Sequence, residues 1–275
     1  MADSKIKVLQ FICPTGFYGA ERWILAIVKN FDPNEVDCHL AVTLETNSQD
    51  LELVKHYRSE CSDMGEVFEI PMSNRFDLRV IKRLVSLIKE KEIDVIHTHG
   101  YKSDILGVIA ARIAGIKSVV TPHGFENSTE WKLRLFIWLG CKAMKYSDTV
   151  APLSPQIVKD VIEHGVDEKD ICYIQNGVDL SEVEASRNAK PSQKNQNNDV
   201  NKDKKIVGFI GQMISRKNIV DILDIFDNLA DKHENLELQL LGDGEERQAL
   251  EKHCANLKHK DKIKFLGFQN NRLQY

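Results

Sequence analysis

Three histidines follow two successive apolar runs of the chain, at positions where side chains could bind a ligand. His97 and His99 end the run at 94–99, and His123 follows the next run at 118–121. On a strand, His97 and His99 would point to the same side, because successive side chains alternate. Imidazoles so placed can hold a metal, hydrogen-bond to sugar or phosphate groups, or, for His97, fill a buried structural position. A metal is the least favoured of these, because no carboxylate lies beside the histidines in the sequence.

A basic pair, Arg216 and Lys217, lies between an apolar run and a helical pattern. The run from Ile206 to Ile210 predicts a buried strand, Gly211 ends it, and apolar residues fall at helical spacing from Ile219 onward. We therefore expect the pair at a helix N-terminus, where free backbone N–H groups and the helix dipole favour an anion such as phosphate. A solvated basic pair on a surface loop is an equally open interpretation.

Glycine-containing turns follow several of the predicted strands. Gly19 and Glu21 lie in or just after the first turn, Asn176 in the turn that ends the first half of the chain, and Gly242 and Gly244 in a later turn. Glycine lets the backbone approach a ligand at a helix N-terminus, but a plain tight turn explains each position as well. The first turn lacks the G-x-G-x-x-G spacing, which argues against NAD binding.

Apolar runs alternate with helical periodicity along the chain, which predicts an α/β protein. The expected strands are 5–13, 38–44, 67–70, 94–98, 118–121, 149–153, 171–174, 206–210, 237–241 and 263–266. The expected helices are 20–30, 51–61, 78–91, 105–114, 130–146, 155–164, 219–232 and 245–257. This alternation requires parallel strands in doubly wound sheets.

A polar stretch at 187–205, rich in Asn, Lys and Gln, divides the alternation in two and has the composition of a linker. We therefore expect two Rossmann-like domains, an N-terminal one at 1–186 and a C-terminal one at 206–275. The second would contain three parallel strands and two helices, which leaves apolar faces uncovered. We expect this second domain to be incomplete.

The composition disfavours several classes of protein. The net charge of −4 and the pI near 6.2 argue against a dedicated nucleic-acid binder. Six scattered cysteines without a CxxC pair are typical of a reduced, cytoplasmic protein without a disulfide framework or a zinc site. No apolar run reaches 18 residues, so we expect no membrane span. Helix 130–146 carries two tryptophans and four basic residues. It could rest peripherally on an anionic membrane surface, although a core helix with solvated basic positions is the favoured interpretation.

Eight motifs, in order, resemble those of the family 4 retaining glycosyltransferases, which have the GT-B fold. They are GAER at 19–22, DVIHTHG at 94–100, VVTPHG at 119–124, LSPQIVKDVIEHGV at 153–166, IQNGVD at 174–179, VGFIGQMISRKN at 207–218, LLGDGE at 240–245 and IKFLGF at 263–268. The resemblance covers nearly the whole chain. It implies two facing Rossmann-like domains with an active site in the cleft between them.

The resemblance also implies roles for individual residues. The C-terminal domain would bind a nucleotide-diphosphate sugar, and the N-terminal domain a glycan or lipid-linked acceptor. The implied catalytic residues are His123, near the transferred sugar, and Lys217 with Arg216, which would neutralise the departing diphosphate. The implied donor- or substrate-binding positions are Gly19, Glu21, His97, His99, Asn176, Gly211, Gln212, Gly242 and Gly244. The reaction would retain the anomeric configuration and need neither a metal nor another cofactor.

Two departures from the family pattern stand out. Gln212 occupies the position of an Arg that usually follows the loop glycine, and glutamine donates hydrogen bonds but no charge, so phosphate stabilisation is weaker unless Arg216 takes over. The family's E-x7-E motif would come after Tyr275, so we expect impaired activity in this chain. The leading hypothesis is a glycosyltransferase of polysaccharide or lipopolysaccharide assembly. A catalytically inactive binding protein is the alternative. A sugar-nucleotide epimerase of the same fold is a weaker third, because no acid–base carboxylates can be placed for it.

Overall fold

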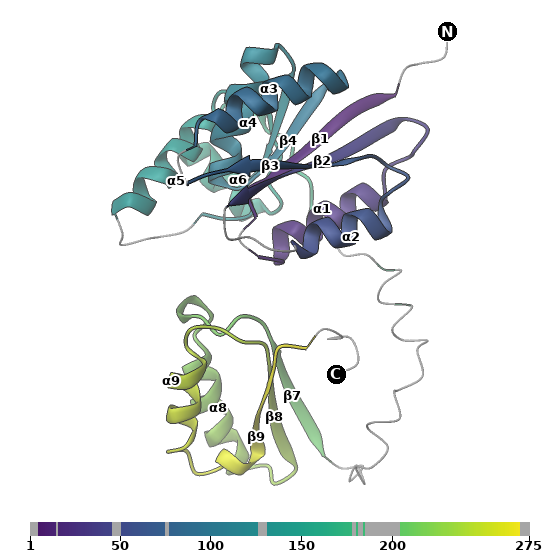
Figure 1. Cartoon of the computed structure of the whole chain (residues 1–275). Coiled ribbons are helices and arrows are strands. Elements are labelled where there is room, and N and C mark those ends of the chain that lie inside the picture. Colours follow the sequence, from purple (N-terminus) through teal and green to yellow (C-terminus); the bar gives the residue numbers. More distant parts are fainter. Residues whose placement is uncertain are drawn as a thin grey trace. The chain divides into compact units, whose positions relative to one another are not determined.

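The structure is a computed structural model that describes residues 5–14, 16–45, 51–74, 77–125, 131–177, 180, 184 and 204–269. The chain divides into two units, Met1–Val178 and Asp179–Tyr275 (Figure 1). The predicted linker lies outside the described residues up to position 203, and Lys205 already belongs to a strand.

The first unit is built on a six-stranded parallel sheet with the strand order β3-β2-β1-β4-β5-β6. The strands are β1 (Ile6–Ile12), β2 (Val36–Glu45), β3 (Val67–Met72), β4 (Val95–His99), β5 (Lys117–Thr121) and β6 (Thr149–Val150). From β1 to β3 the chain adds strands on one side of the sheet, and from β4 to β6 it adds them on the other, so the strand order reverses between β1 and β4. The carboxyl ends of these two strands therefore form the switch point, where doubly wound sheets bind their ligands.

Helices cover both faces of this sheet, as the predicted alternation requires. They are α1 (Gly19–Lys29), α2 (Glu52–Glu60), α3 (Arg79–Lys91), α4 (Tyr101–Ala114), α5 (Trp131–Met144) and α6 (Pro155–Glu163), followed by the 3-10 helix η1 (Glu168–Asp170). Helices α1 and α2 pack on one face through a core that includes Ile24, Val28 and Tyr57. Helices α3 and α4 pack on the other through a core that includes Leu84 and Ala110 (Figure 1).

Two predicted strands near the end of the first unit differ from the structure: one is shorter than predicted, and the other does not form. The segment 171–174 makes only a single parallel bridge, from Ile171 to Val150, and β6 ends at Val150 instead of continuing to 153. Pro152 explains both differences, because proline has no N–H to give to a strand ladder. Beyond the bridge, the N–H groups of Ile174 and Asn176 donate to the carbonyls of Pro152 and Leu153, so the two segments still run side by side.

The second unit contains a parallel sheet of β7 (Lys205–Ile210), β8 (Leu236–Leu241) and β9 (Ile263–Gly267), in that order. Its helices are α8 (Ile219–Ala230) and α9 (Arg247–Cys254), with two 3-10 helices, η3 (Ser215–Lys217) and η4 (Lys260–Lys262). Both α helices lie on the same face of the sheet (Figure 1). Leu223, Phe226 and Leu250 from these helices pack on Leu238 and Leu240 of the central strand.

The prediction that 206–210 is a buried strand is wrong in one respect. The strand forms, but Ile206, Val207 and Ile210 are 56%, 45% and 58% exposed. β7 is an edge strand among the described residues, and helices cover one face of its sheet. An apolar run predicts a strand, but it does not say whether that strand lies at the edge of its sheet or whether helices cover both faces.

Candidate functional site

The three histidines singled out by the sequence come together at the carboxyl edge of the first sheet. His97 Nε2 lies 2.8 Å from Thr121 Oγ1, and His99 Nδ1 lies 3.2 Å from His123 Nε2. His97 and His99 are buried at 7% and 2% exposure, whereas His123 reaches solvent. The cluster lies at the ends of β4 and β5, beside the switch point, so the structure confirms the proximity that the strand pattern predicted.

Trp23 of α1 forms a wall against all three imidazoles. The centroid of its ring system lies 5.8 Å from that of His97, 5.5 Å from that of His99 and 5.8 Å from that of His123. Trp23 lies in the helix that the sequence predicts at 20–30. Its position one turn after Gly19, where α1 begins, is what brings it to the sheet edge. Trp23 therefore packs against the histidine cluster from the side of α1.

Burial keeps these imidazoles neutral. Desolvation lowers the pKa of His97 to about 3, with a smaller contribution from His123, and lowers the pKa of His99 well below its usual range. Although His123 reaches solvent, partial desolvation of its ring lowers its pKa as well. The cluster therefore offers uncharged hydrogen-bonding groups at neutral pH, which suit hydroxyl-bearing ligands.

The hydrogen bonds of the cluster disfavour the metal interpretation. His97 uses Nε2 on Thr121, and His99 uses both ring nitrogens, on Gln10 and His123. The described residues contain no group of three or more His, Cys, Asp or Glu placed to hold a metal ion. The imidazoles therefore bind one another and their neighbours in an arrangement suited to hydrogen bonding.

Glu21 and Gly19 belong to the first turn of α1. Glu21 is buried, and its Oε2 accepts a hydrogen bond from the backbone N–H of Tyr18 at 2.9 Å, which caps the helix. A Cβ on Gly19 would meet no other atom within 4 Å. Gly19 therefore keeps space open at a helix N-terminus, while the visible role of Glu21 is structural.

In the second unit, the glycine loops after β7 and β8 pack directly on each other. Gly211 N–H donates to Leu241 O at 3.0 Å, and Met213 N–H donates to Asp243 O at 2.9 Å. A Cβ on Gly242 would lie 1.9 Å from Gly211 O, and one on Gly244 would lie 2.4 Å from Met213 O. Close backbone approach is therefore sufficient reason for both later glycines, whether or not they also face a ligand.

The basic pair lies where the sequence predicted. Arg216 and Lys217 are exposed in η3, directly before α8, and Asn218 joins the two helices in the left-handed conformation at φ 48°. Gln212 lies in the same loop and is half-buried. This arrangement combines cationic side chains with the positive end of a three-turn helix, which suits an anionic group.

Asn176 lies apart from these features. It is exposed, and its N–H donates to Leu153 O at 3.1 Å. No contact described for it joins it to the histidine cluster, so its predicted role in binding stays a prediction.

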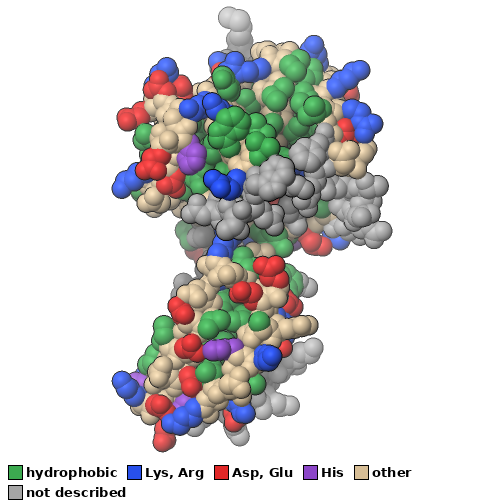
Figure 2. All heavy atoms as spheres, turned by 90° about the vertical axis from the view of Figure 1, so that its left-hand side faces the viewer, with side chains coloured by type: hydrophobic (Ala, Val, Ile, Leu, Met, Phe, Trp, Pro, Cys, Tyr) green, Lys and Arg blue, Asp and Glu red, His purple; other side chains and the backbone are tan. Residues whose placement is uncertain are grey.

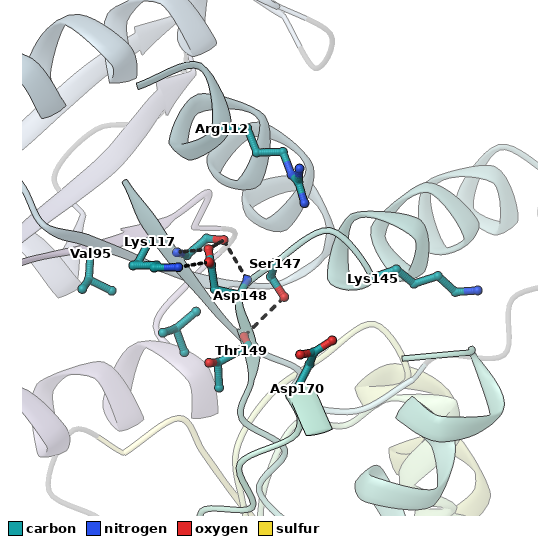
Figure 3. A pocket seen from close by; sticks show the side chains of 10 residues that line it. Val95, Arg112, Lys117, Lys145, Ser147, Asp148, Thr149 and Asp170 are labelled. Atoms are coloured by element: carbon teal, nitrogen blue, oxygen red, sulfur yellow. Dashed lines mark hydrogen bonds and ion pairs between the residues drawn. The ribbon is translucent and has the colours of Figure 1, made fainter. Parts of the chain in front are cut away.

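A hollow of about 610 Å³ opens at the opposite edge of the first sheet, lined by the starts of β4, β5 and β6 (Figure 3). Lys117 Nζ pairs with Asp148 Oδ1 at 2.7 Å, and Arg112 donates to Tyr146 O from Nε and Nη2. The hollow is at the amino ends of the strands, away from the ligand-binding edge of this fold. Its polar groups join β5 to the turn before β6, which is a structural role.

Helix α5 carries a second exposed feature. Its inner side buries Gly140, Cys141 and Met144, but its outer side exposes a further apolar stripe of Leu135, Trp138 and Leu139 at 47%, 55% and 38%. Figure 2 turns this side of the unit to the viewer and shows hydrophobic side chains gathered there with Lys and Arg at their border. A helix that is apolar on both sides normally has a partner on each.

The surroundings of this stripe are basic. Arg134 and Lys142 are exposed on α5, and Lys142 Nζ lies 5.3 Å from the centre of the Trp138 ring. The segment 131–146 contains no Asp or Glu. No helix among the described residues is long and apolar enough to cross a membrane. The stripe is therefore an exposed apolar surface with a basic border.

Comparison with known proteins identifies the family. The model of Glycosyltransferase Family 4 matches residues 17–182, and that of Glycosyl transferases group 1 matches residues 191–274. The chain belongs to glycosyltransferase family 4. This confirms the resemblance drawn from the eight motifs.

Individual relatives agree with this assignment. The chain is 28% identical over 202 residues to the UDP-Gal:alpha-D-GlcNAc-diphosphoundecaprenol alpha-1,3-galactosyltransferase of Escherichia coli, covering 70% of this chain and 52% of that one. It is 25% identical over 211 residues to the N-acetyl-alpha-D-glucosaminyl L-malate synthase of Bacillus anthracis, covering 74% and 53%. The chain thus spans about half the length of the curated relatives it matches.

A solved structure confirms the fold class. The Anabaena protein HepE in complex with UDP superposes with a TM-score of 0.76 and 18% sequence identity, covering 98% of this chain and 71% of that one. At this identity the likeness establishes the GT-B fold with its two parallel sheets.

Proposed function

We propose that the protein transfers a sugar from a nucleotide-diphosphate sugar to an acceptor, with retention of the anomeric configuration. The observation that carries this proposal is the neutral imidazole cluster at the switch point, where His123 reaches solvent beside the two buried histidines His97 and His99. Uncharged donors and acceptors at a ligand-binding edge suit the hydroxyl groups of a sugar. Membership of family 4 supports the same chemistry.

Features of the second unit support a role in stabilising a departing diphosphate. Negative charge grows on this leaving group as the glycosidic bond breaks. A cation held in place therefore stabilises the transition state more than the ground state. Lys217 and Arg216 at the start of α8 are suited to this task, with Gln212 as a hydrogen-bond donor in the same loop. No metal ion takes part in this proposal.

We further propose that the acceptor is lipid-linked and belongs to polysaccharide or other envelope glycoconjugate assembly. The exposed apolar stripe of α5, with its basic border, supports a peripheral contact with an anionic membrane surface. The E. coli relative acts on a diphosphoundecaprenol-linked sugar by its name. Co-sedimentation with phosphatidylglycerol vesicles tests this contact. A double change of Trp138→Ser and Lys142→Ser should abolish it, and undiminished binding by this variant would contradict the proposal.

A panel of nucleotide-diphosphate sugars tests the central proposal. The full chain is incubated with each donor and a polyprenyl-diphosphate-linked sugar acceptor, and nucleotide diphosphate release is followed. Acceptor-dependent release from one donor would support transfer. Binding of a donor without any release would favour the alternative, a catalytically inactive binding protein. Interconversion of the donor sugar without acceptor would favour the epimerase.

A further inference from the structure

Gln10 lies beneath the histidine cluster at a position that controls where its protons sit. It is fully buried in β1, in register with His97 of the neighbouring β4. Its Oε1 lies 2.8 Å from His99 Nε2, and His99 Nδ1 lies 3.2 Å from His123 Nε2. The three side chains form a continuous hydrogen-bonded chain from the core of the sheet to the solvent-facing imidazole.

We propose that Gln10 is a positioning residue that fixes the tautomer of His123 through His99, so that His123 presents Nδ1 to the ligand as a hydrogen-bond acceptor. A carbonyl oxygen can only accept, so the proton of His99 lies on Nε2. A neutral imidazole carries one N–H, which leaves His99 Nδ1 as an acceptor. His123 must then donate from Nε2, and its Nδ1 is left with a free lone pair.

The tautomers are defined only while the rings are neutral, because an imidazolium would donate from both nitrogens. His99 is 2% exposed, and Trp23 closes one side of all three rings. In the described part of the chain, the hydrogen-bond partners of these rings are an amide, a hydroxyl and each other, and none is a carboxylate. The surroundings therefore offer nothing that would hold a second proton on His99.

The orientation of the Gln10 amide is the controlling variable. In the structure Gln10 Nε2 is buried and, among the described residues, has no hydrogen-bond partner. The reverse orientation would direct Nε2 at His99 and reverse every proton in the chain. His123 would then present an N–H group. The two arrangements predict opposite chemistry at the same atom.

This tautomer limits the groups that His123 can bind. An acceptor at Nδ1 takes a hydrogen bond from a hydroxyl group, whereas the oxygens of a diphosphate are acceptors and would be repelled. His123 is thereby assigned to a sugar hydroxyl and not to the phosphates of the donor. The identity of this hydroxyl rests on the proposed function, but the tautomer is a property of the chain alone.

Nitrogen NMR measures the tautomer directly. The full chain is labelled with 15N-histidine, and long-range 1H–15N spectra are recorded without ligand at pH 7. Signals of His123 are assigned by their loss in His123→Asn. We expect His123 and His99 each to carry the proton on Nε2, favoured by roughly tenfold, as two coupled hydrogen bonds allow. A proton on Nδ1 of His123 in the unaltered chain would overturn the proposal.

Two variants separate control by Gln10 from general packing. Gln10→Met has similar volume but no amide, and we expect the fraction of His99 and His123 that carries the proton on Nδ1 to rise severalfold. Thr121→Val is the matched control, since it removes the partner of His97 and leaves the Gln10 chain intact; its His123 tautomer should not change. An unaltered tautomer in folded Gln10→Met would contradict the proposal. Failure of the sugar-donor panel would leave the NMR result unaffected, so the two proposals fail separately.

Discussion

Replacing His97 by Gln should make the stability of the first unit less sensitive to acid. The folded-state pKa of His97 is about 3, against about 6.5 for an unfolded chain. Between these values the unfolded chain takes up a proton that the folded chain refuses, so stability is lost as the pH falls below 6.5. From pH 7 to pH 5 this loss is about 2 kcal/mol for His97 alone. His97→Gln keeps a group near Thr121 and removes the titration.

Urea unfolding followed by tryptophan fluorescence measures this effect, because all three tryptophans, at 23, 131 and 138, lie in the first unit. The variant should be less stable than the unaltered chain at pH 7, and the gap should shrink by about 2 kcal/mol at pH 5. Contributions from other groups cancel in this difference. His233→Gln, an exposed change in the second unit, is the control and should leave the first unit's unfolding unaltered. A gap that stays constant with pH would refute the neutral, desolvated imidazole.

Three further changes test other parts of the structure. Asp104 is buried on α4, and burial raises its pKa to about 8, so the stability of the first unit falls as the pH rises from about 4 to 8. In the same urea assay, the stability of Asp104→Asn relative to the unaltered chain should rise by about 3 kcal/mol between pH 5 and pH 7. Equal pH dependence of the two proteins would contradict this. Gly242→Ala forces a Cβ to 1.9 Å from the carbonyl oxygen of Gly211, at a φ of 137° that alanine rarely adopts. Hydrogen exchange of the β8 amides should therefore show a loss of several kcal/mol in the stability of the second unit. Gly208→Ala, whose Cβ meets nothing within 4 Å, should show no such loss. Lys217→Ala should weaken nucleotide-diphosphate binding in calorimetry at least tenfold, while Lys232→Ala, just beyond the C-terminal end of α8, should not. Equal affinities would remove Lys217 from the site.

Periodicity predicted most of the architecture because each strand and each helix of the first unit carries its own apolar pattern. The alternation from 5 to 121 became β1 to β5 with their helices, and the strand pattern placed His97 and His99 on one side. The errors came from long-range or single-residue effects. Pro152 ended a ladder that hydropathy alone continued, and the exposure of Ile206 and Ile210 depends on which elements lie beside β7.

The sequence predicted the histidines of the candidate site but not the residues that contact them from behind, Gln10 and Trp23. Motifs at strand ends indicated the histidines, because polar residues that directly follow an apolar run can be recognised in the sequence. Gln10 and Trp23 gave little signal, because one sits inside an apolar strand and the other on the inward face of an amphipathic helix. A glutamine in the middle of the apolar run 8–13 is the signal in the sequence that points to Gln10, because burying an amide requires a hydrogen-bond partner.

The most direct test of the central claim is the rate of nucleotide-diphosphate release from the sugar donor by the unaltered chain and by His123→Ala, both shown to be folded. If transfer takes place at the neutral imidazole cluster, release should depend on acceptor and fall on the order of a hundredfold in the variant. Equal rates in the two proteins would place the chemistry elsewhere. Absence of release from every donor, with the unaltered chain folded, would contradict sugar transfer by this chain.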